Sequence, residues 1–339
     1  MSFALLETPG NPIPPGARVV GLTTRDGATL RAAWWPATAR NPKGTVCVLQ
    51  GRAEFIEKYA ETIVELLERG FAVVAFDWRG QGFSQRDVEN DRKGHVASFS
   101  LFAHDLEAVR EDILARMPEP HFALGHSMGG AIALVAAREG RLPFERLVAV
   151  APMVALCMVR RPRAATRLAY VLDALGLGRL FIPGGGETSI ATKPFPGNRL
   201  TADPARYARN AVAASGVGAA AVGDPTIGWV AAAFRLMRLF EDPAFPLSIR
   251  LPTLIVAAGA DPVCATPAIE RFAARLKAGH AVVIPGSRHE VLMERDAIRE
   301  QFWAAFDAFV PGSRSPALVE ASERDAARAA RDGGLAQVA

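Results

Sequence analysis

Short, uninterrupted apolar segments recur along the chain and predict strands of a parallel sheet. They lie at 45–49, 72–76, 122–124 and 147–150. A strand that is covered on both faces carries apolar residues at every position, so these runs indicate buried strands. Between them, apolar residues at helical spacing predict helices over 56–69 and 99–117, the first ending at Gly70. Strands that alternate with helices indicate a parallel sheet with right-handed crossovers.

The first part of the chain has a different pattern of apolar and polar residues. Apolar and polar residues alternate over 18–24 and 29–35, on either side of Asp26 and Gly27. An alternating pair of segments around an Asp-Gly turn predicts an antiparallel hairpin, which we place at one edge of the sheet.

The strand and helix alternation stops after Met153 and resumes at 251–258, followed by a strand at 281–284 and a helix at 296–309. We therefore expect a mostly parallel α/β sheet with an N-terminal antiparallel hairpin and an inserted helical cap. The predicted parts are a first core segment at 1–152, the cap at 153–247, a second core segment at 248–312 and a flexible tail at 313–339.

The cap sequence is rich in arginine and poor in acids, which predicts a basic surface over an apolar interior. Its basic residues include Arg160, Arg161, Arg163, Arg167, Lys193, Arg199, Arg206 and Arg209. Such a surface would suit an anionic head group and contact with an anionic membrane, although an ordinary solvated helix fits the pattern equally well.

Composition narrows the functional classes. The 339 residues carry a net charge of +4, too weak and too spread out for a nucleic-acid-binding footprint. No apolar run is long enough to cross a bilayer and 1–16 does not resemble a signal peptide, so we expect a cytoplasmic protein that could rest on the inner membrane surface. The scattered Cys47, Cys157 and Cys264 predict core residues, with no disulfide, metal site or organic cofactor.

A Gly-x-Ser-x-Gly motif at 125–129 carries the first candidate chemistry. It joins the apolar run at 122–124 to a small-residue helical segment at 130–137. A serine on a sharp strand-to-helix turn needs small neighbours, which Gly125 and Gly129 supply, and it faces the positive end of the helix. We predict that Ser127 is a nucleophile; a tight structural turn is the alternative.

A serine hydroxyl needs a base, and the base needs a carboxylate that orients it. Asp261 follows the predicted strand at 254–258, and His289 follows the strand at 281–284, in the order Ser, Asp, His. We predict that these residues complete a catalytic triad, although another carboxylate could orient the base. His126 occupies a variable position of the motif, where packing is favoured over proton transfer.

The oxyanion of an acyl-transfer reaction needs preorganised N–H donors. We expect one from the backbone of Met128, directly after the nucleophile, and one from the backbone of Arg52, after the strand at 45–49. The side chain of Arg52 forms a possible charged cluster with Glu54 and Lys58 at the mouth of the site, but a solvated ion-pair face explains these residues equally well.

Together these motifs resemble those of the α/β-hydrolase superfamily, and more narrowly of its lysophospholipases and monoacylglycerol lipases. The motifs are Gly51-Arg52-Ala53-Glu54, Asp77-Trp78-Arg79-Gly80-Gln81-Gly82-Phe83-Ser84, Gly94-His95-Val96, Gly125 to Gly130 and Arg288-His289-Glu290. The Gly-Arg-x-Glu loop and the sequence Pro225-Thr226-Ile227-Gly228-Trp229 are most similar to bacterial lysophospholipase L2. Gln50 and Ala53 depart from the monoacylglycerol lipase pattern, which disfavours that branch.

The resemblance implies a serine hydrolase that cleaves a lipid ester, a lysophospholipid or a monoacyl ester, through an acyl-enzyme. A generalist short-chain carboxylesterase is the main alternative. A proline-type aminopeptidase would need acidic cap residues, and a non-catalytic binding protein would be expected to have a damaged triad. We expect a small-molecule lipid ester and no nucleic acid as partner; the substrate-binding residues, head group, acyl length and oligomeric state stay open.

Overall fold

The computed structural model describes residues 3–141 and 144–311, and an eight-stranded sheet organises them. The strands are β1 (Arg18–Thr23), β2 (Thr29–Trp35), β3 (Thr45–Leu49), β4 (Ala72–Phe76), β5 (His121–His126), β6 (Arg146–Val150), β7 (Thr253–Ala258) and β8 (Gly279–Ile284). Their order is β1-β2-β4-β3-β5-β6-β7-β8. Only the β1–β2 and β2–β4 pairs are antiparallel, so the prediction of a mostly parallel sheet with an N-terminal hairpin at one edge is confirmed.

The interior strands are buried as their sequences predict. Every residue of β3, β4 and β5 is buried, because neighbouring strands flank each of them and helices cover both faces. The edge strand β8 differs: its run of apolar residues is mostly exposed or half-buried.

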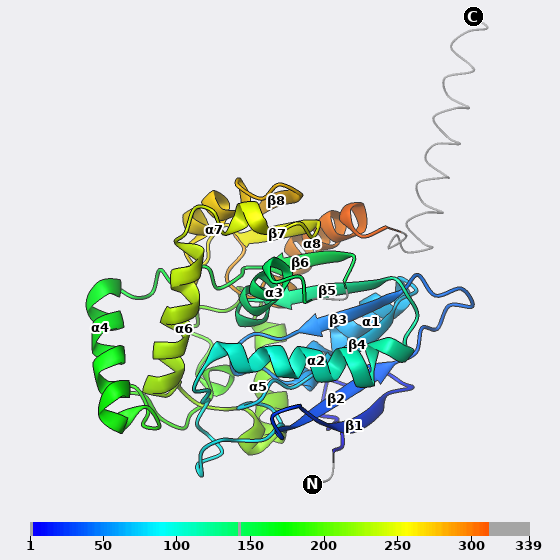
Figure 1. The fold of residues 1–339 in the computed structure, drawn as a ribbon. Helices are drawn as coiled ribbons and strands as arrows, with labels where there is room; N and C mark the ends of the chain where they lie inside the picture. Colours follow the sequence, from blue (N-terminus) through cyan, green and yellow to red (C-terminus); the bar gives the residue numbers. More distant parts are fainter. Residues whose placement is uncertain (1–2, 142–143, 312–339) are drawn as a thin grey trace, which may run out of the picture.

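Helices cover the two faces of this sheet (Figure 1). The helices α1 (Ala60–Glu68) and α8 (Asp296–Phe309) pack into one apolar core with residues of the strands. The helices α2 (Phe102–Asp112), α3 (Met128–Arg138) and α7 (Thr266–Ala273) pack into the other. The helices predicted at 56–69 and 99–117 are each divided, with short 3-10 turns at their ends.

After β6 the chain leaves the sheet, and it returns with β7. The helices in between are α4 (Pro162–Leu172), α5 (Pro204–Gly216) and α6 (Ile227–Phe240). Figure 1 shows α6 beside the sheet and α4 outside it. Apolar residues of α6 join the core that contains α2, α3 and α7, so this segment is packed onto the body of the protein.

The basic surface predicted for this segment exists only in part. Arg160, Arg161, Arg163 and Arg167 are exposed. Arg206 and Arg209 on α5 instead bind Glu61 on α1, with N–O distances of 2.7 and 2.5 Å, so the core compensates part of their charge.

Two other expectations concern the cysteines and the tail. Cys47 and Cys264 are buried, but the prediction for Cys157 was wrong because its side chain is exposed on the segment that leaves the sheet. The tail predicted at 313–339 lies outside the described residues. No helix within 3–141 or 144–311 is long and apolar enough to cross a membrane.

Candidate active site

Ser127 stands at a strained turn between β5 and α3. Its backbone has φ 48° and ψ −110°, a conformation that a residue with a side chain adopts only when its surroundings impose it. The Ser127 amide donates to the Val150 carbonyl at 2.9 Å, and its carbonyl accepts from the amides of Ala131 and Met153, both at 3.0 Å. These bonds tie the turn to β6 and to the first turn of α3.

The glycines around Ser127 are required by close backbone contacts. A Cβ on Gly129 would lie 2.2 Å from the Leu49 carbonyl oxygen, far inside van der Waals contact. A Cβ on Gly125 would lie 2.9 Å from the backbone of Gly130. The motif therefore allows α3 to approach β3 and β5 closely enough to hold the serine at the strand ends.

The three residues predicted as a triad form a hydrogen-bonded chain with His289 in the middle. Ser127 Oγ is 3.0 Å from His289 Nε2, and His289 Nδ1 is 2.8 Å from Asp261 Oδ2. All three follow the carboxyl ends of parallel strands, β5, β7 and β8, which meet at one edge of the sheet.

Asp261 is fixed by its own turn. Its Oδ1 accepts the backbone amides of Val263 and Cys264 at 2.8 and 3.0 Å, which leaves Oδ2 for His289. The carboxylate is fully buried and the His289 side chain is 6% exposed. Because Asp261 accepts at Oδ2, we assign the His289 proton to Nδ1, so that Nε2 can accept the Ser127 proton.

The two predicted oxyanion donors lie just after the carboxyl ends of the neighbouring strands β3 and β5. Met128 is the first residue of α3, where a backbone N–H has no acceptor within the helix. Arg52 lies in the loop after β3, and this loop is held on both sides: Gly51 donates its amide to Glu54 at 2.5 Å, and Gln81 binds the Gly51 carbonyl and the Ala53 amide. Ala53 has φ 60°, so the loop turns sharply here.

Glu54 and Lys58 form a buried network, so the alternative of a solvated ion-pair face was wrong. Glu54 is 4% and Lys58 7% exposed. Lys58 Nζ binds Glu54 Oε1 at 2.8 Å and Glu290 Oε1 at 2.6 Å, and Tyr59 donates its hydroxyl to Glu54 at 2.5 Å. The network links the Arg52 loop to the residue that follows His289.

His126 belongs to the same network and does more than pack. Its Nδ1 is 3.0 Å from Glu54 Oε1, and its Nε2 is 3.2 Å from the His289 carbonyl oxygen. A carboxylate and a carbonyl only accept, so both ring nitrogens must carry protons and the ring is an imidazolium. Two carboxylates, Glu54 and Glu290, thus face two cations, Lys58 and His126, and the buried charges balance.

The pKa shifts of the residues in this network follow from the arrangement of these buried charges. Burial disfavours the charged carboxylate, but Lys58 and His126 together hold the pKa of Glu54 well below its usual value. Burial also disfavours the imidazolium, and Glu54 more than compensates, so the pKa of His126 is raised. The pKa of Tyr59 is raised by burial and by the Glu54 charge, which keeps its phenol protonated.

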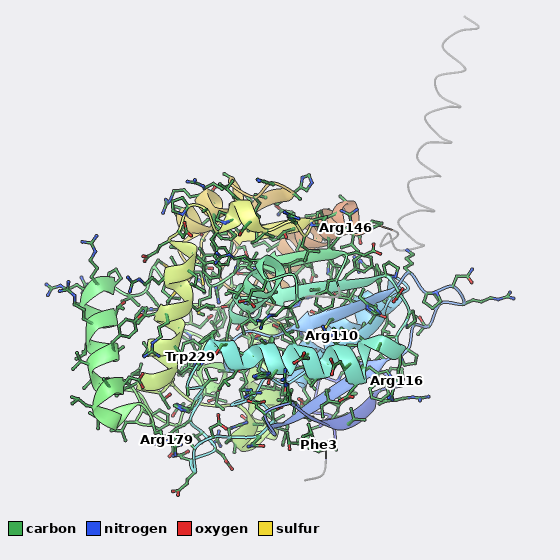
Figure 2. The ribbon with its side chains drawn as sticks, viewed as in Figure 1. Phe3, Arg110, Arg116, Arg146, Arg179 and Trp229 are labelled. Carbon is green, nitrogen blue, oxygen red and sulfur yellow. The ribbon has the colours of Figure 1, made fainter. Side chains whose placement is uncertain are left out.

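The Arg52 side chain does not join this cluster, contrary to the expectation. Its Nη2 donates to the Gly223 carbonyl at 2.5 Å, and its guanidinium lies 5.3 Å from the ring centroid of Trp229 on α6. Figure 2 labels Trp229 near the start of α6, where its ring centroid lies 5.6 Å from that of Phe99. The side chain therefore lies at the seam between the core and the segment inserted after β6.

A possible group of metal ligands in the described residues coincides with the triad. One ligand atom each of Asp261, Cys264 and His289 lies within 4.8 Å of the others. Both His289 nitrogens are engaged by Asp261 and Ser127, and both Asp261 oxygens are engaged as well. The arrangement fits a proton relay better than a metal site.

Sequence comparisons place the chain among known hydrolases. Residues 40–296 match the family described as serine aminopeptidase, S33. The chain is 31% identical over 292 residues to lysophospholipase L2 of Escherichia coli (strain K12), covering 82% of this chain and 83% of that protein. It is 30% identical over 164 residues to the monoglyceride lipase of Rattus norvegicus, 47% of this chain and 52% of the lipase.

Solved structures show the same fold. A soluble variant of the monoglyceride lipase from Saccharomyces cerevisiae, in complex with a substrate analogue, aligns with a TM-score of 0.67 at 18% identity. The alignment covers 88% of this chain and 97% of that one.

Proposed function

The chain belongs to the serine aminopeptidase S33 family of α/β-hydrolases, and within this family we propose that it is a serine esterase that cleaves lysophospholipids or monoacyl esters. The observation that carries the proposal is the hydrogen-bonded chain from Ser127 through His289 to Asp261. The similarity to lysophospholipase L2 over 82% of the chain supports the choice of a lipid ester.

In the proposed mechanism His289 Nε2 takes the proton from Ser127 Oγ as the oxygen attacks the ester carbonyl. The amides of Arg52 and Met128 donate to the oxyanion of the tetrahedral intermediate, and Asp261 holds the imidazolium. His289 then protonates the leaving alcohol, which departs as the acyl-enzyme forms. Water attacks the acyl-enzyme with His289 as base, releases the fatty acid and restores Ser127.

For the acyl chain we propose the groove between α4 and α6, a cavity of about 790 Å³ whose lining combines apolar side chains with Arg163, Arg167, Arg238 and Glu241. Val154, Leu156, Phe234 and Met237 contribute to its lining. The groove begins next to Met153, whose amide donates to the Ser127 carbonyl. In this proposal 153–247 act as the cap over the site, and an acyl chain would lie on apolar side chains.

An aminopeptidase activity is less well supported by the charges near the site. A substrate amino terminus needs a free carboxylate. Glu54 and Glu290 are both bound to Lys58, and Asp261 holds His289. The acidic residue that lines the proposed groove, Glu241, shares it with Arg163, Arg167 and Arg238. The cation Arg52, by contrast, forms no ion pair with a carboxylate of the described residues, which favours an anionic substrate.

We also propose that the α4 region contacts an anionic membrane. Apolar side chains are exposed on it and on the residues around it: Met158, Leu168, Val171, Leu175 and Leu180, between 49 and 69%. Arg160, Arg161 and Arg163 are exposed at its start. Cations beside exposed apolar residues favour the surface of an anionic bilayer. Co-sedimentation with phosphatidylglycerol vesicles should fall in Leu168→Glu; equal sedimentation of both proteins would contradict the proposal.

A panel of esters tests the function. Purified protein and Ser127→Ala, as the blank, are compared on lysophospholipids, monoacylglycerols and p-nitrophenyl acetate and butyrate. We expect Ser127-dependent hydrolysis of the lipid esters. Turnover confined to the acetate and butyrate esters would instead indicate a generalist carboxylesterase, and none on any ester would favour a binding protein.

A further inference from the structure

Arg52 is half-buried, and it differs from the buried arginines of the described residues in binding no carboxylate; Arg69, for example, binds Asp307. Arg31, Arg79 and Arg299 each bind two carboxylates: Glu57 and Asp77, Asp26 and Asp105, and Glu61 and Glu65. Arg86, which is also half-buried, has no ion pair in the part of the chain that the structure describes but donates to the carbonyl oxygens of Asp91, Ser84, Gly82 and Ala219. Arg52 has one recorded acceptor, the Gly223 carbonyl.

The remaining donors of Arg52 are short of partners. Its Nε is buried and has no hydrogen-bond partner among the described residues. Withdrawing a cation partly from water without a counter-ion is costly, so this half-buried guanidinium is suited to an anion supplied from outside. Burial lowers the pKa of Arg52 to about 10, with Asp224 partly opposing the shift. The side chain is therefore still charged at neutral pH.

The position of Arg52 relates this charge to the reacting ester. The backbone amide of Arg52 is the proposed oxyanion donor, while its guanidinium lies between Gly94, Gly223 and Trp229. One residue thus offers a donor to the ester carbonyl and, one side-chain length away, a cation. The contacts to Gly223 and Trp229 hold the guanidinium at the seam with the cap, which limits where a bound anion can lie.

We propose that the Arg52 side chain binds the phosphodiester of a lysophospholipid and so selects it over a neutral monoacyl ester. This inference rests on the proposed function. In a lysophospholipid, glycerol separates the ester carbonyl from the phosphate, so the two groups can reach the amide and the side chain of one arginine. A guanidinium matches phosphate oxygens with paired N–H donors, whereas a monoacylglycerol offers no charge at this position.

The test compares two substrates with the same octanoyl chain, a lysophosphatidylglycerol and a monoacylglycerol. Enzyme concentration is set by fluorophosphonate titration, so only folded protein is counted. We expect Arg52→Met to lower kcat/KM for the lysophospholipid about tenfold or more beyond any loss on the monoacylglycerol. Arg86→Met is the matched control, because it removes a second half-buried arginine that has no ion pair with the described residues, and it should leave the substrate ratio unchanged.

Equal losses on the two substrates in Arg52→Met would overturn the inference. A second measurement does not depend on the variant folding: inhibition of the wild-type enzyme by ether analogues, an octyl glycerol ether and an octyl glycerophosphoglycerol ether. The phosphodiester analogue should inhibit at about tenfold lower concentration, and equal inhibition would also overturn the inference.

The outcomes separate this inference from the proposed function. If the wild-type enzyme hydrolyses both lipids with no preference, the proposed lipid esterase function holds and only the proposed role of Arg52 is contradicted. If the wild-type enzyme cleaves neither lipid, both the proposed function and the proposed role of Arg52 are contradicted.

Discussion

Lys58 Nζ lies 2.6 Å from Glu290 Oε1 and thereby connects two loops that are far apart in the chain. Lys58 follows the loop that carries Arg52, and Glu290 follows His289. Through Glu54, the same ammonium also reaches the Gly51 amide. The proposed oxyanion donor and the proposed base are therefore set by one buried network.

Replacing Lys58 by methionine should destabilise the fold strongly. The variant leaves Glu54 and Glu290 buried without their shared cation, and breaking a buried pair in this way costs about 3–5 kcal/mol. Urea unfolding of Lys58→Met is to be compared with Lys277→Met, which removes an exposed lysine. A loss below about 1 kcal/mol in Lys58→Met would show that the network contributes little.

Asp261→Asn should leave the fold intact and remove most of the activity. The side-chain oxygen of asparagine can still accept the amides of Val263 and Cys264, but its amide nitrogen cannot accept the His289 Nδ1 proton. By analogy with other triads, kcat should fall about 10³–10⁴-fold. Circular dichroism checks the fold, and wild-type kcat in the folded variant would mean that another carboxylate orients His289.

Glu61 joins the inserted segment to the core, and its removal should weaken that attachment. It accepts hydrogen bonds from Arg206 and Arg209 on α5 and forms an ion pair with Arg299 on α8. Glu61→Gln leaves three neighbouring cations without this carboxylate, so we expect a loss of about 1–3 kcal/mol in unfolding free energy. Glu107→Gln, at a half-exposed ion pair with Arg110, should change stability by less than about 0.5 kcal/mol.

Glu61 should also make the stability of the protein depend on pH. Burial disfavours the charged form, but the hydrogen bonds from Arg206 and Arg209 lower the pKa of Glu61 from 4.5 to about 2. A carboxylate whose pKa is lowered on folding stabilises the protein above its unfolded pKa and loses this effect as pH falls through the folded pKa. The stability difference between wild type and Glu61→Gln should shrink between pH 4.5 and 2. A difference that stays constant over this range would contradict the assignment.

Gly129→Ala should be disruptive because its Cβ would meet the Leu49 carbonyl oxygen at 2.2 Å. Since backbone cannot move aside cheaply, we expect a loss of about 2–3 kcal/mol together with lower activity. Gly186→Ala is the matched control, with no atom within 4 Å of its Cβ and no positive φ. Thermal unfolding of the two variants gives the comparison, and similar melting temperatures would show that the turn tolerates a side chain.

The sequence predicts those features that depend on local pattern. Buried strands such as β3 and β5 are recognisable because every position is apolar, and Ser127 is recognisable because its turn needs glycine on both sides. The edge strand β8 has the same apolar pattern and is largely exposed, since no local signal tells an edge from the interior.

Features that depend on distant partners were missed. The Glu54–Lys58 pair is visible at a spacing of four residues, but its burial depends on Glu290, 232 residues beyond Lys58. Arg206 and Arg209 suggested a basic surface, yet both bind Glu61 from α1. The presence of Glu290 directly after His289 was the available signal for the network, because charged neighbours of a buried base need partners of their own.

The most direct test of the account is covalent labelling of the nucleophile. Folded protein is treated with a fluorophosphonate, and the labelled peptide is identified by mass spectrometry. We predict one label per chain on Ser127, none in Ser127→Ala, and labelling slowed about 10³-fold or more in His289→Ala. A folded wild-type protein that takes up no label, or that is labelled at another residue, would contradict the assignment of Ser127 as an activated nucleophile.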